Sequence, residues 1–239
     1  QLYIASTHSY FLVFTNKGRL FWLKVHEIPV GMPSAQGKAI VNLLALGPEE
    51  KVATILPVKE FVPGPSLVMA TSRGVVKKTD LMNFSRPRSG GLIALGLVQG
   101  DELVGVALSQ EEQSILMGTR QGQIIRFPAE QVRDMGRGAR GVRGIKVAED
   151  DRVVGMEVLR PEGTILTVTE RGFGKRTDPT KYPQHNRGGK GVKGLHITGR
   201  NGPVVKILQV VEDDQIMLVT DGGKIMRIAV KGISVIGRV

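Results

Sequence analysis

Lysine and arginine are the residue types whose number and spacing most clearly indicate a chemistry in this chain. The 239 residues include 33 Lys and Arg against 22 Asp and Glu, which gives a formal net charge of +11. The charge alternates between three basic segments (71–94, 119–146, 169–196) and the segment that follows each of them (95–118, 147–168, 197–219). The basic segments hold 19 Lys and Arg and 5 Asp and Glu, whereas the following segments hold 4 and 12. Charge that serves only solubility would not alternate in this way, so the pattern predicts a basic surface that binds a polyanion.

The polyanion that best fits this pattern is duplex DNA, held by its phosphates. Binding to a membrane surface needs an amphipathic helix, an apolar wedge or a lipid anchor, and the sequence indicates none of these. Reading base edges needs an element that enters a groove, and stacking on single-stranded bases needs aromatic residues, which make up only 5% of the chain. We therefore expect phosphate contacts with little sequence preference. A scaffold that binds an acidic protein is the alternative.

Acidic residues and histidines give weaker indications of chemistry. Paired carboxylates could hold Mg²⁺ or act as acid and base, but the four pairs recur where turns are expected: Glu49/Glu50, Asp101/Glu102, Asp150/Asp151 and Asp213/Asp214. We interpret them as solvated turn residues. The four histidines have no spacing that suits zinc, cysteine is absent, and no G-x-S-x-G motif occurs. We therefore expect neither a metal site nor catalytic residues in this chain.

Two stretches match the G-x-G-x-x-G pattern of dinucleotide-binding loops, namely Gly136–Gly141 and Gly189–Gly194. That fingerprint has to follow a strand and open a helix. Here each stretch opens an alternating apolar run, GIKVA or GLHIT, that is typical of a strand. The basic residues between the glycines have no role in a dinucleotide fold, so we reject a nucleotide site.

The elements that must position the basic residues follow from an internal repeat. The pattern Thr-x-x-Gly begins at five places, 56, 48, 50 and 51 residues apart: Thr15, Thr71, Thr119, Thr169 and Thr220. An apolar run precedes each copy, and a second run ending in a basic residue follows. Glycines in the long loops lie 20 or 22 residues after their threonines: Gly37, Gly91, Gly141 and Gly191. A period near 50 residues built from short runs indicates one supersecondary unit per period.

One repeat, between Ile115 and Leu159, predicts four strands: ILMGT, QIIRF, IKVA and VVGMEVL. No segment shows sustained helical periodicity. Four strands per period predict an all-β, propeller-like disc of four-stranded blades. We expect a single domain over 1–239, with units at about 6–58, 66–108, 114–159 and 164–210 and an incomplete fifth at 215–239. Leu2–Ala5 is interpreted as the closing strand of an earlier unit.

The order of the motifs resembles the C-terminal domain of DNA gyrase A, a component of a type IIA topoisomerase. The similar stretches include STHSYFLVFTNKGRLFWLKVHEIP, MATSRGVVKKTDL, GDELVGVAL, ARGVRGIKV and RGFGKRT, and they run in the same order along nearly the whole chain. The resemblance implies a β-pinwheel, usually of six blades, whose basic outer rim wraps duplex DNA. The related domain of topoisomerase IV is the alternative within this family, although its repeats are usually more degraded.

The gyrase signature of the first blade reads Gln, basic, Arg, Gly, Gly, basic, Gly. The nearest match here, Gln184–Gly191, has one extra residue and lies in the fourth unit. We therefore expect the chain to be a fragment that carries the second to fifth blades and half of the sixth. Such a fragment is expected to bind linear duplex DNA but to constrain little positive writhe.

Basic residues of the central units are the predicted DNA contacts. They are Arg73, Lys77, Lys78, Arg86, Arg88, Arg126, Arg137, Arg140, Arg143, Lys175, Arg176, Arg187, Lys190 and Lys193.

The resemblance also implies the setting in which these contacts work. No cofactor is expected in this domain, because ATP and Mg²⁺ are used by other parts of the gyrase holoenzyme. The implied partners are duplex DNA, the remainder of gyrase A and its companion gyrase B, with no membrane and a monomeric isolated domain. The implied function is DNA wrapping that supports ATP-dependent negative supercoiling, and the implied location is the cytoplasm, with the nucleoid.

Overall fold

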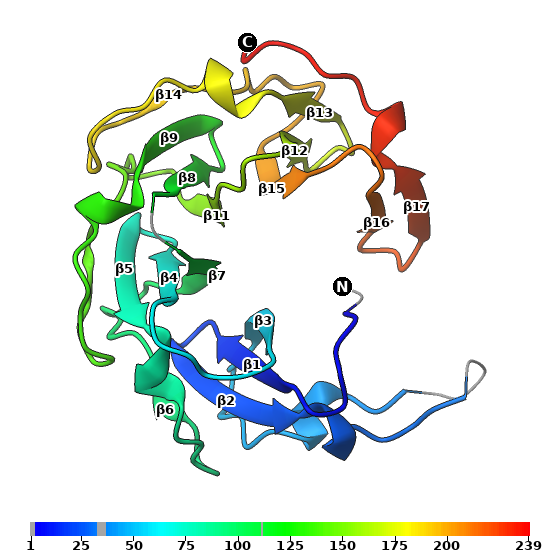
Figure 1. Cartoon of the computed structure of the whole chain (residues 1–239). Helices are drawn as coiled ribbons and strands as arrows, with labels where there is room; N and C mark the ends of the chain where they lie inside the picture. Colours follow the sequence, from blue (N-terminus) through cyan, green and yellow to red (C-terminus); the bar gives the residue numbers. More distant parts are fainter. Residues whose placement is uncertain (1–2, 33–36, 111) are drawn as a thin grey trace. The chain divides into compact units, whose positions relative to one another are not determined.

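The computed structural model of the chain describes residues 3–32, 37–110 and 112–239. Throughout these residues the strands form five small antiparallel sheets, and the helical elements are single 3₁₀ turns (Figure 1). The elements group into two compact units. Among the described residues, the N-terminal unit comprises 3–32, 37–110 and 132–142, and the C-terminal unit comprises 112–131 and 143–239. The predicted all-β, propeller-like class is confirmed.

Each Thr-x-x-Gly copy closes a β-hairpin. The hairpins are β1–β2 (Tyr10–Thr15, Arg19–Lys24), β4–β5 (Ser66–Thr71, Val75–Asp80), β8–β9 (Ser114–Thr119, Gln123–Pro128), β12–β13 (Thr164–Thr169, Gly174–Thr177) and β16–β17 (Gln215–Val219, Ile225–Ala229). In the third copy, the Gly122 N–H donates to the Thr119 carbonyl at 3.0 Å, and the Thr119 hydroxyl accepts from the Gln123 N–H at 3.1 Å. Gly122 has φ +80°, a value that favours glycine in a three-residue hairpin loop. These contacts explain why threonine and glycine recur at this spacing.

The last strand of each of the first four repeats lies beside the first strand of the same repeat. These strands are β3 (Val52–Val58), β7 (Leu103–Ser109), β11 (Val153–Val158) and β15 (Val204–Val210). The register shifts near the threonine that ends the first strand, for example between Ala70 and Thr71. The first strand lies between the second and the last strand of its repeat, and in β4 all six residues are buried. A short continuous apolar run is the sequence pattern of such a buried strand.

The fourth strand of each of the first three sheets comes from the next repeat along the chain. β6 (Leu92–Ile93), β10 (Val142–Arg143) and β14 (Val192–Lys193) pair with β2, β5 and β9, which are the second strands of the preceding repeats. The predicted strands at IKVA and GLHIT are therefore wrong in position and in partner. Ile145 is buried and Lys146 exposed, so the alternation of IKVA reflects burial along an extended loop rather than pairing in a sheet.

Loop glycines make this exchange of strands possible. An added Cβ would lie 2.9 Å from the Leu20 carbonyl oxygen at Gly91 and 2.3 Å from the Ile124 carbonyl oxygen at Gly191. Both glycines have positive φ, +72° and +70°. The recurring glycines are thus the points at which one repeat approaches the backbone of the previous one. Gly37 has no atom near its Cβ position.

Short 3₁₀ turns follow the second strands and lead into the long loops. They are η1 (Val25–Glu27), η3 (Leu81–Phe84), η4 (Ala129–Gln131), η5 (Pro179–Lys181) and η6 (Val230–Gly232), while η2 (Ile40–Asn42) lies within the first long loop. Residues 33–36 of that loop, inside the predicted first unit, lie outside the described residues. Tyr3–Ala5 form no strand, contrary to prediction, and Leu2 lies outside the described residues.

The core is built mainly from aliphatic side chains, as the low aromatic content requires. In the N-terminal unit, Leu12, Leu67 and Met69 are fully buried in one cluster. In the C-terminal unit, Ile165 and Tyr182 are fully buried in another. Each cluster combines residues from successive repeats, so the repeats stabilise one another rather than fold as separate domains.

Candidate nucleic-acid interface

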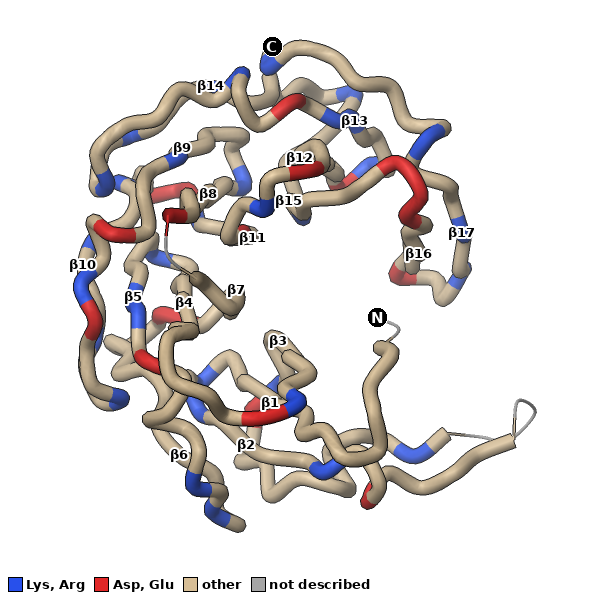
Figure 2. Tube along the Cα trace, in the orientation of Figure 1, with Lys and Arg blue, Asp and Glu red and all other residues tan. Residues whose placement is uncertain are grey.

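The alternation of charge along the sequence becomes a separation between the two edges of each of the first three sheets. One edge is made by β6, β10 or β14, and the loops next to these strands carry the basic segments; we call it the basic edge. The opposite edge is made by β7, β11 or β3, each of which follows an acidic turn. Figure 2 shows Lys and Arg on both sides of β10 and β14 and at the tip of the segment before β6.

The predicted contact residues differ in their exposure. Six are exposed: Arg73, Arg86, Arg88, Arg140, Arg143 and Lys190. Five are half-buried: Lys78, Arg126, Arg137, Arg187 and Lys193. Three are buried: Lys77, Lys175 and Arg176. The buried three already have their charged groups in contacts within the protein, so they are not free to meet a phosphate.

Lys77 and Lys175 occupy the same place in two repeats, six residues after the threonine. The Lys77 ammonium donates to the Ala94 carbonyl at 2.6 Å and to the Arg137 carbonyl. The Lys175 ammonium donates to the carbonyls of Gly237, at 2.8 Å, and Arg238. Burial lowers the pKa of both lysines, and that of Lys77 falls to about 8, with the Arg137 charge as the second cause. Each lysine therefore anchors the long loop of the next repeat.

Arg176 is buried for a different reason. Its guanidinium donates to the Ile233 carbonyl at 2.8 Å and pairs with the Glu212 carboxylate at 2.9 Å. Both partners belong to the chain itself. The Arg176 charge, which was predicted to face DNA, therefore holds the loop after β17 instead.

Several half-buried basic residues also fix loops through backbone carbonyls. Arg126 donates to the Pro179 carbonyl at 3.2 Å, and Arg187 donates to the Gln131 carbonyl at 2.9 Å. Such bonds leave the positive charge without a carboxylate partner. Lys78, by contrast, pairs with Asp134 at 3.5 Å.

One recurring contact between repeats was missed by the sequence reasoning. Arginine lies 18 residues after the threonine in three repeats, as Arg137, Arg187 and Arg238. Arg137 donates to the Asn83 carbonyl at 3.5 Å, and Arg187 makes the corresponding bond to Gln131. The same spacing in the sequence could have added Arg238, which is half-buried, to the predicted set.

One residue of each of the first three acidic pairs is a structural acceptor rather than a solvated residue. Glu50 accepts from the Thr15 hydroxyl at 2.6 Å, and Asp101 accepts from the Ser72 hydroxyl at 2.8 Å. Asp151 accepts from the Gln121 N–H at 2.9 Å. Glu50 and Asp101 are also buried. These three carboxylates hold the tips of the first three hairpins, which corrects the solvated-turn interpretation for them.

A model of the family described as the DNA gyrase C-terminal domain, beta-propeller, matches five segments of the chain: 9–59, 65–110, 113–160, 163–210 and 214–239. The chain belongs to the family of DNA gyrase A C-terminal domains. Similar curated proteins are the DNA gyrase A proteins of Salmonella typhimurium, 48% identical, Escherichia coli, 44% identical, and Halalkalibacterium halodurans, 53% identical. These matches cover 100% of the chain but only 27%, 27% and 29% of the relatives. The chain thus spans between a quarter and a third of the length of these relatives.

Two solved structures share the fold. The C-terminal domain of DNA topoisomerase IV superposes with a TM-score of 0.86 at 27% identity, covering 97% of this chain and 73% of that one. The DNA gyrase A C-terminal domain gives 0.84 at 27% identity, covering 98% and 76%. The fold does not separate gyrase from topoisomerase IV. The family model and the curated relatives, at 44% to 53% identity, name gyrase.

No helix in the described residues has the length and apolar character needed to cross a membrane.

A carboxylate away from the basic edge gives a stability test. Burial raises the pKa of Glu157, in β11, to about 7, although Lys206 and Arg160 favour its ionised form. Between pH 4.5 and 7 the folded state therefore binds more protons than the unfolded state, so this group lowers stability as pH rises through that window. We expect Glu157→Gln to raise the free energy of unfolding at pH 8 by about 1 to 3 kcal/mol, from about 1.4 kcal/mol per pKa unit, and to give no gain at pH 4.

Urea unfolding at both pH values measures this difference. Glu162→Gln, which neutralises an exposed carboxylate on the loop after β11, is the control for a general change of charge. An equal gain from Glu157→Gln at pH 4 and pH 8 would contradict the assignment to burial.

Proposed function

We propose that this chain binds duplex DNA through its phosphates, with little preference for sequence, as part of a DNA gyrase A protein. The observation that carries the proposal is the basic edge: each of the first three sheets has basic segments beside one edge and an acidic turn before the strand at the opposite edge. Cations that recur once per repeat along the chain suit a ligand with many regularly spaced phosphates. Short glycine-rich loops are poorly suited to enter a groove and read bases.

The proposed contacts are the predicted residues that remain accessible, together with the residue found from the recurring spacing. They are Arg73, Lys78, Arg86, Arg88, Arg126, Arg137, Arg140, Arg143, Arg187, Lys190, Lys193 and Arg238. The buried Lys77, Lys175 and Arg176 are proposed to shape the loops instead.

The wider role follows the family. We propose that the bound duplex is wrapped and that wrapping supports ATP-dependent negative supercoiling by the gyrase holoenzyme. Catalytic residues, ATP and Mg²⁺ are proposed to belong to the rest of gyrase A and to gyrase B, with no cofactor in this domain. The cytoplasm, with the nucleoid, is the proposed location, and a monomer is the proposed state of the isolated chain.

A mobility-shift titration with two duplexes of unrelated sequence tests DNA binding. We expect dissociation constants that agree within about threefold, because phosphate contacts carry no sequence information. Polyglutamate, at equal charge, serves as the probe for an acidic-protein scaffold and should compete weakly. Tight binding of polyglutamate with no shift of either duplex would favour the scaffold and overturn the proposal.

Ligation of a nicked plasmid in the presence of the chain measures wrapping as a shift in linking number. The chain covers 76% of the solved gyrase A domain, so we expect a smaller positive shift than from full-length gyrase A. A shift of opposite sign would exclude the proposed handedness of wrapping.

A further inference from the structure

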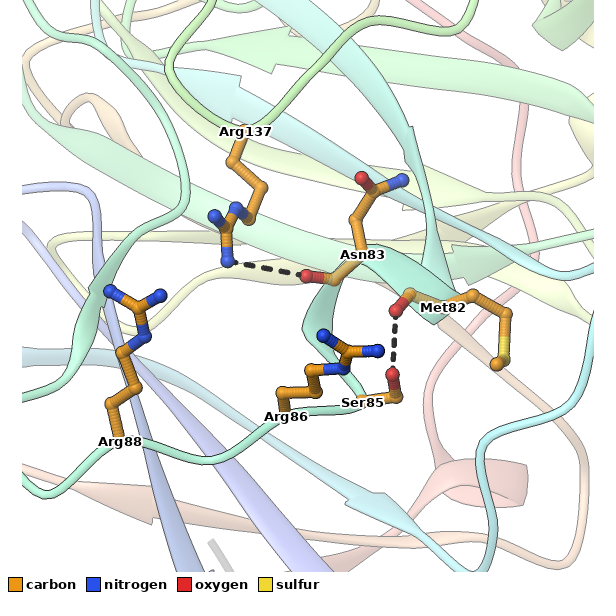
Figure 3. Close-up of a pocket in the computed structure, with 6 residues that line it drawn as sticks. All are labelled: Met82, Asn83, Ser85, Arg86, Arg88 and Arg137. Carbon is orange, nitrogen blue, oxygen red and sulfur yellow. Dashed lines mark hydrogen bonds between the residues drawn. The ribbon is translucent and has the colours of Figure 1, made fainter.

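A pocket in the N-terminal unit is lined by three arginines from two repeats. It has a volume of about 420 Å³ and is bounded by Met82, Asn83, Ser85, Arg86, Arg88 and Arg137. Five of these residues follow β5, and Arg137 comes from the loop before β10. Figure 3 shows Arg88 extending toward the end of the Arg137 side chain, while the Arg86 side chain runs toward Ser85.

The local sequence fixes the first two arginines. Pro87 restricts its own φ and keeps Arg86 out of the helical region, and both arginines border the pocket. The preceding turn η3 is held at both ends. The Asp80 carboxylate accepts from the Met82 N–H at 2.7 Å, and the Ser85 hydroxyl donates to the Met82 carbonyl at 2.8 Å.

The third arginine is held through its backbone and its side chain. Its guanidinium donates to the Asn83 carbonyl at 3.5 Å. Its own carbonyl accepts from the Lys77 ammonium, which is fully buried. Lys77 therefore fixes the point at which the next repeat delivers Arg137 to the pocket.

The pocket gathers positive charge without compensation. None of the three arginines takes part in an ion pair within the described part of the chain. Lys77 adds a fourth cation, and the charge that acts on it is that of Arg137. The carboxylate of Asp134, on the same loop as Arg137, pairs with Lys78 and not with Lys77. Guanidinium groups that border one pocket repel one another unless an anion lies between them, and their planar donors match the oxygens of a phosphate.

We propose that this pocket is a phosphate site in which Arg86, Arg88 and Arg137 together hold one backbone phosphate of the duplex, and that Lys77 is the positioning residue of the site. This proposal rests on the proposed function, which supplies the phosphate, and it adds one defined position at which the duplex is held. In this pocket, three arginines from two repeats border one cavity. The duplex is thus held in a defined position at β6, not only by a diffuse field.

The test compares variants in which exposed arginines are replaced by neutral glutamine, so that the core stays intact. Arg86→Gln with Arg88→Gln removes two of the three donors, and Arg133→Gln removes an exposed arginine of the same unit that lies outside the pocket. With a duplex of about 40 base pairs at fixed salt, we expect the double variant to lose between about 10- and 100-fold in affinity, since hydrogen bonds to charged groups are worth about tenfold each. The control should lose about twofold.

The outcomes separate this proposal from the function on which it rests. Failure of the wild-type chain to bind any duplex removes the proposed function and the proposal with it. Binding by the wild type with equal losses in the double variant and the control overturns the phosphate site alone. A second arm uses inorganic pyrophosphate, read from backbone amide NMR shifts. Shifts confined to 82–88 and 137, without a specific loss of duplex affinity in the double variant, would assign the pocket to a free phosphate compound and overturn the DNA assignment.

A pH profile tests the positioning role. The Lys77 ammonium, with its pKa lowered to about 8, loses its charge between pH 7 and 9.5 and with it a charge-assisted bond to the Arg137 carbonyl. We expect the duplex affinity of the wild type to fall by about threefold over this range and that of Lys77→Met to stay level apart from changes common to both proteins. Parallel profiles would show that Lys77 is only structural.

Discussion

Raising the salt concentration from 50 to 200 mM should weaken binding of duplex DNA to this chain by about 10⁴-fold. If about eight of the twelve proposed residues meet phosphates, the plot of log K against log salt concentration should have a slope near −7, from about −0.9 per phosphate. A fourfold rise in salt then reduces the affinity by about 4 to the seventh power. A fluorescence anisotropy titration at several salt concentrations gives the slope directly.

Charge reversal at the basic edge provides the control for this result. Arg140 and Arg143 lie on either side of Val142 and are both exposed. Changing both to Glu should make the slope shallower by about two, with little change in stability because neither side chain is buried. A salt-independent affinity, or an unchanged slope in this variant, would contradict binding led by phosphates.

Replacing Gly191 by alanine should destabilise the C-terminal unit by about 4 kcal/mol. A left-handed backbone costs a residue with a side chain roughly 1 to 2 kcal/mol, and Gly191 has φ +70°. The new Cβ would also lie 2.3 Å from the Ile124 carbonyl oxygen, so β14 would have to move away from β9. Moving β14 displaces Lys190 and Lys193, and we therefore expect weaker DNA binding as well. Urea unfolding followed by circular dichroism measures the loss of stability.

A matched substitution lies two residues away. Gly189 has its nearest atoms at 3.9 Å from the Cβ position and no positive φ. Gly189→Ala should therefore change the free energy of unfolding by no more than about 0.5 kcal/mol. Equal unfolding midpoints for the two variants would show that the close approach at Gly191 is not needed.

The repeat and its hairpins could be predicted because their signal is local. Thr119, Gly122 and the apolar runs around them interact within a few residues, and these contacts recur at each copy. The fourth strand could not be placed from the sequence. Its two residues pair with the preceding repeat, and Val142 with Arg143 have no apolar alternation to mark them. The neighbouring IKVA run has that alternation but serves to bury Ile145.

The candidate interface was predictable in its location but not residue by residue. Charge segregation in the sequence places Arg86, Arg88 and Arg140 at the exposed basic edge. Strand alternation places Lys77 and Lys78 on opposite faces of β5, but the local sequence does not show which lysine is buried. Lys77 can be buried because two backbone carbonyls from distant segments accept hydrogen bonds from its ammonium group. The pocket formed with Arg137 depends on the same long-range contact.

The strand that each repeat gives to its predecessor has a consequence for how such a chain can be divided or extended. A cut between two sequence repeats, for example before Ser66, would separate β2 from β6 and leave β2 as an unpaired edge, which is a template for association with other chains. A complete four-stranded sheet therefore does not coincide with one sequence repeat: it extends about half a period into the next repeat. Duplication or loss of modules in evolution preserves pairing when its boundaries follow this half-period offset. Because each of these strands completes the sheet of the preceding repeat, unfolding of one repeat should also destabilise the repeat before it.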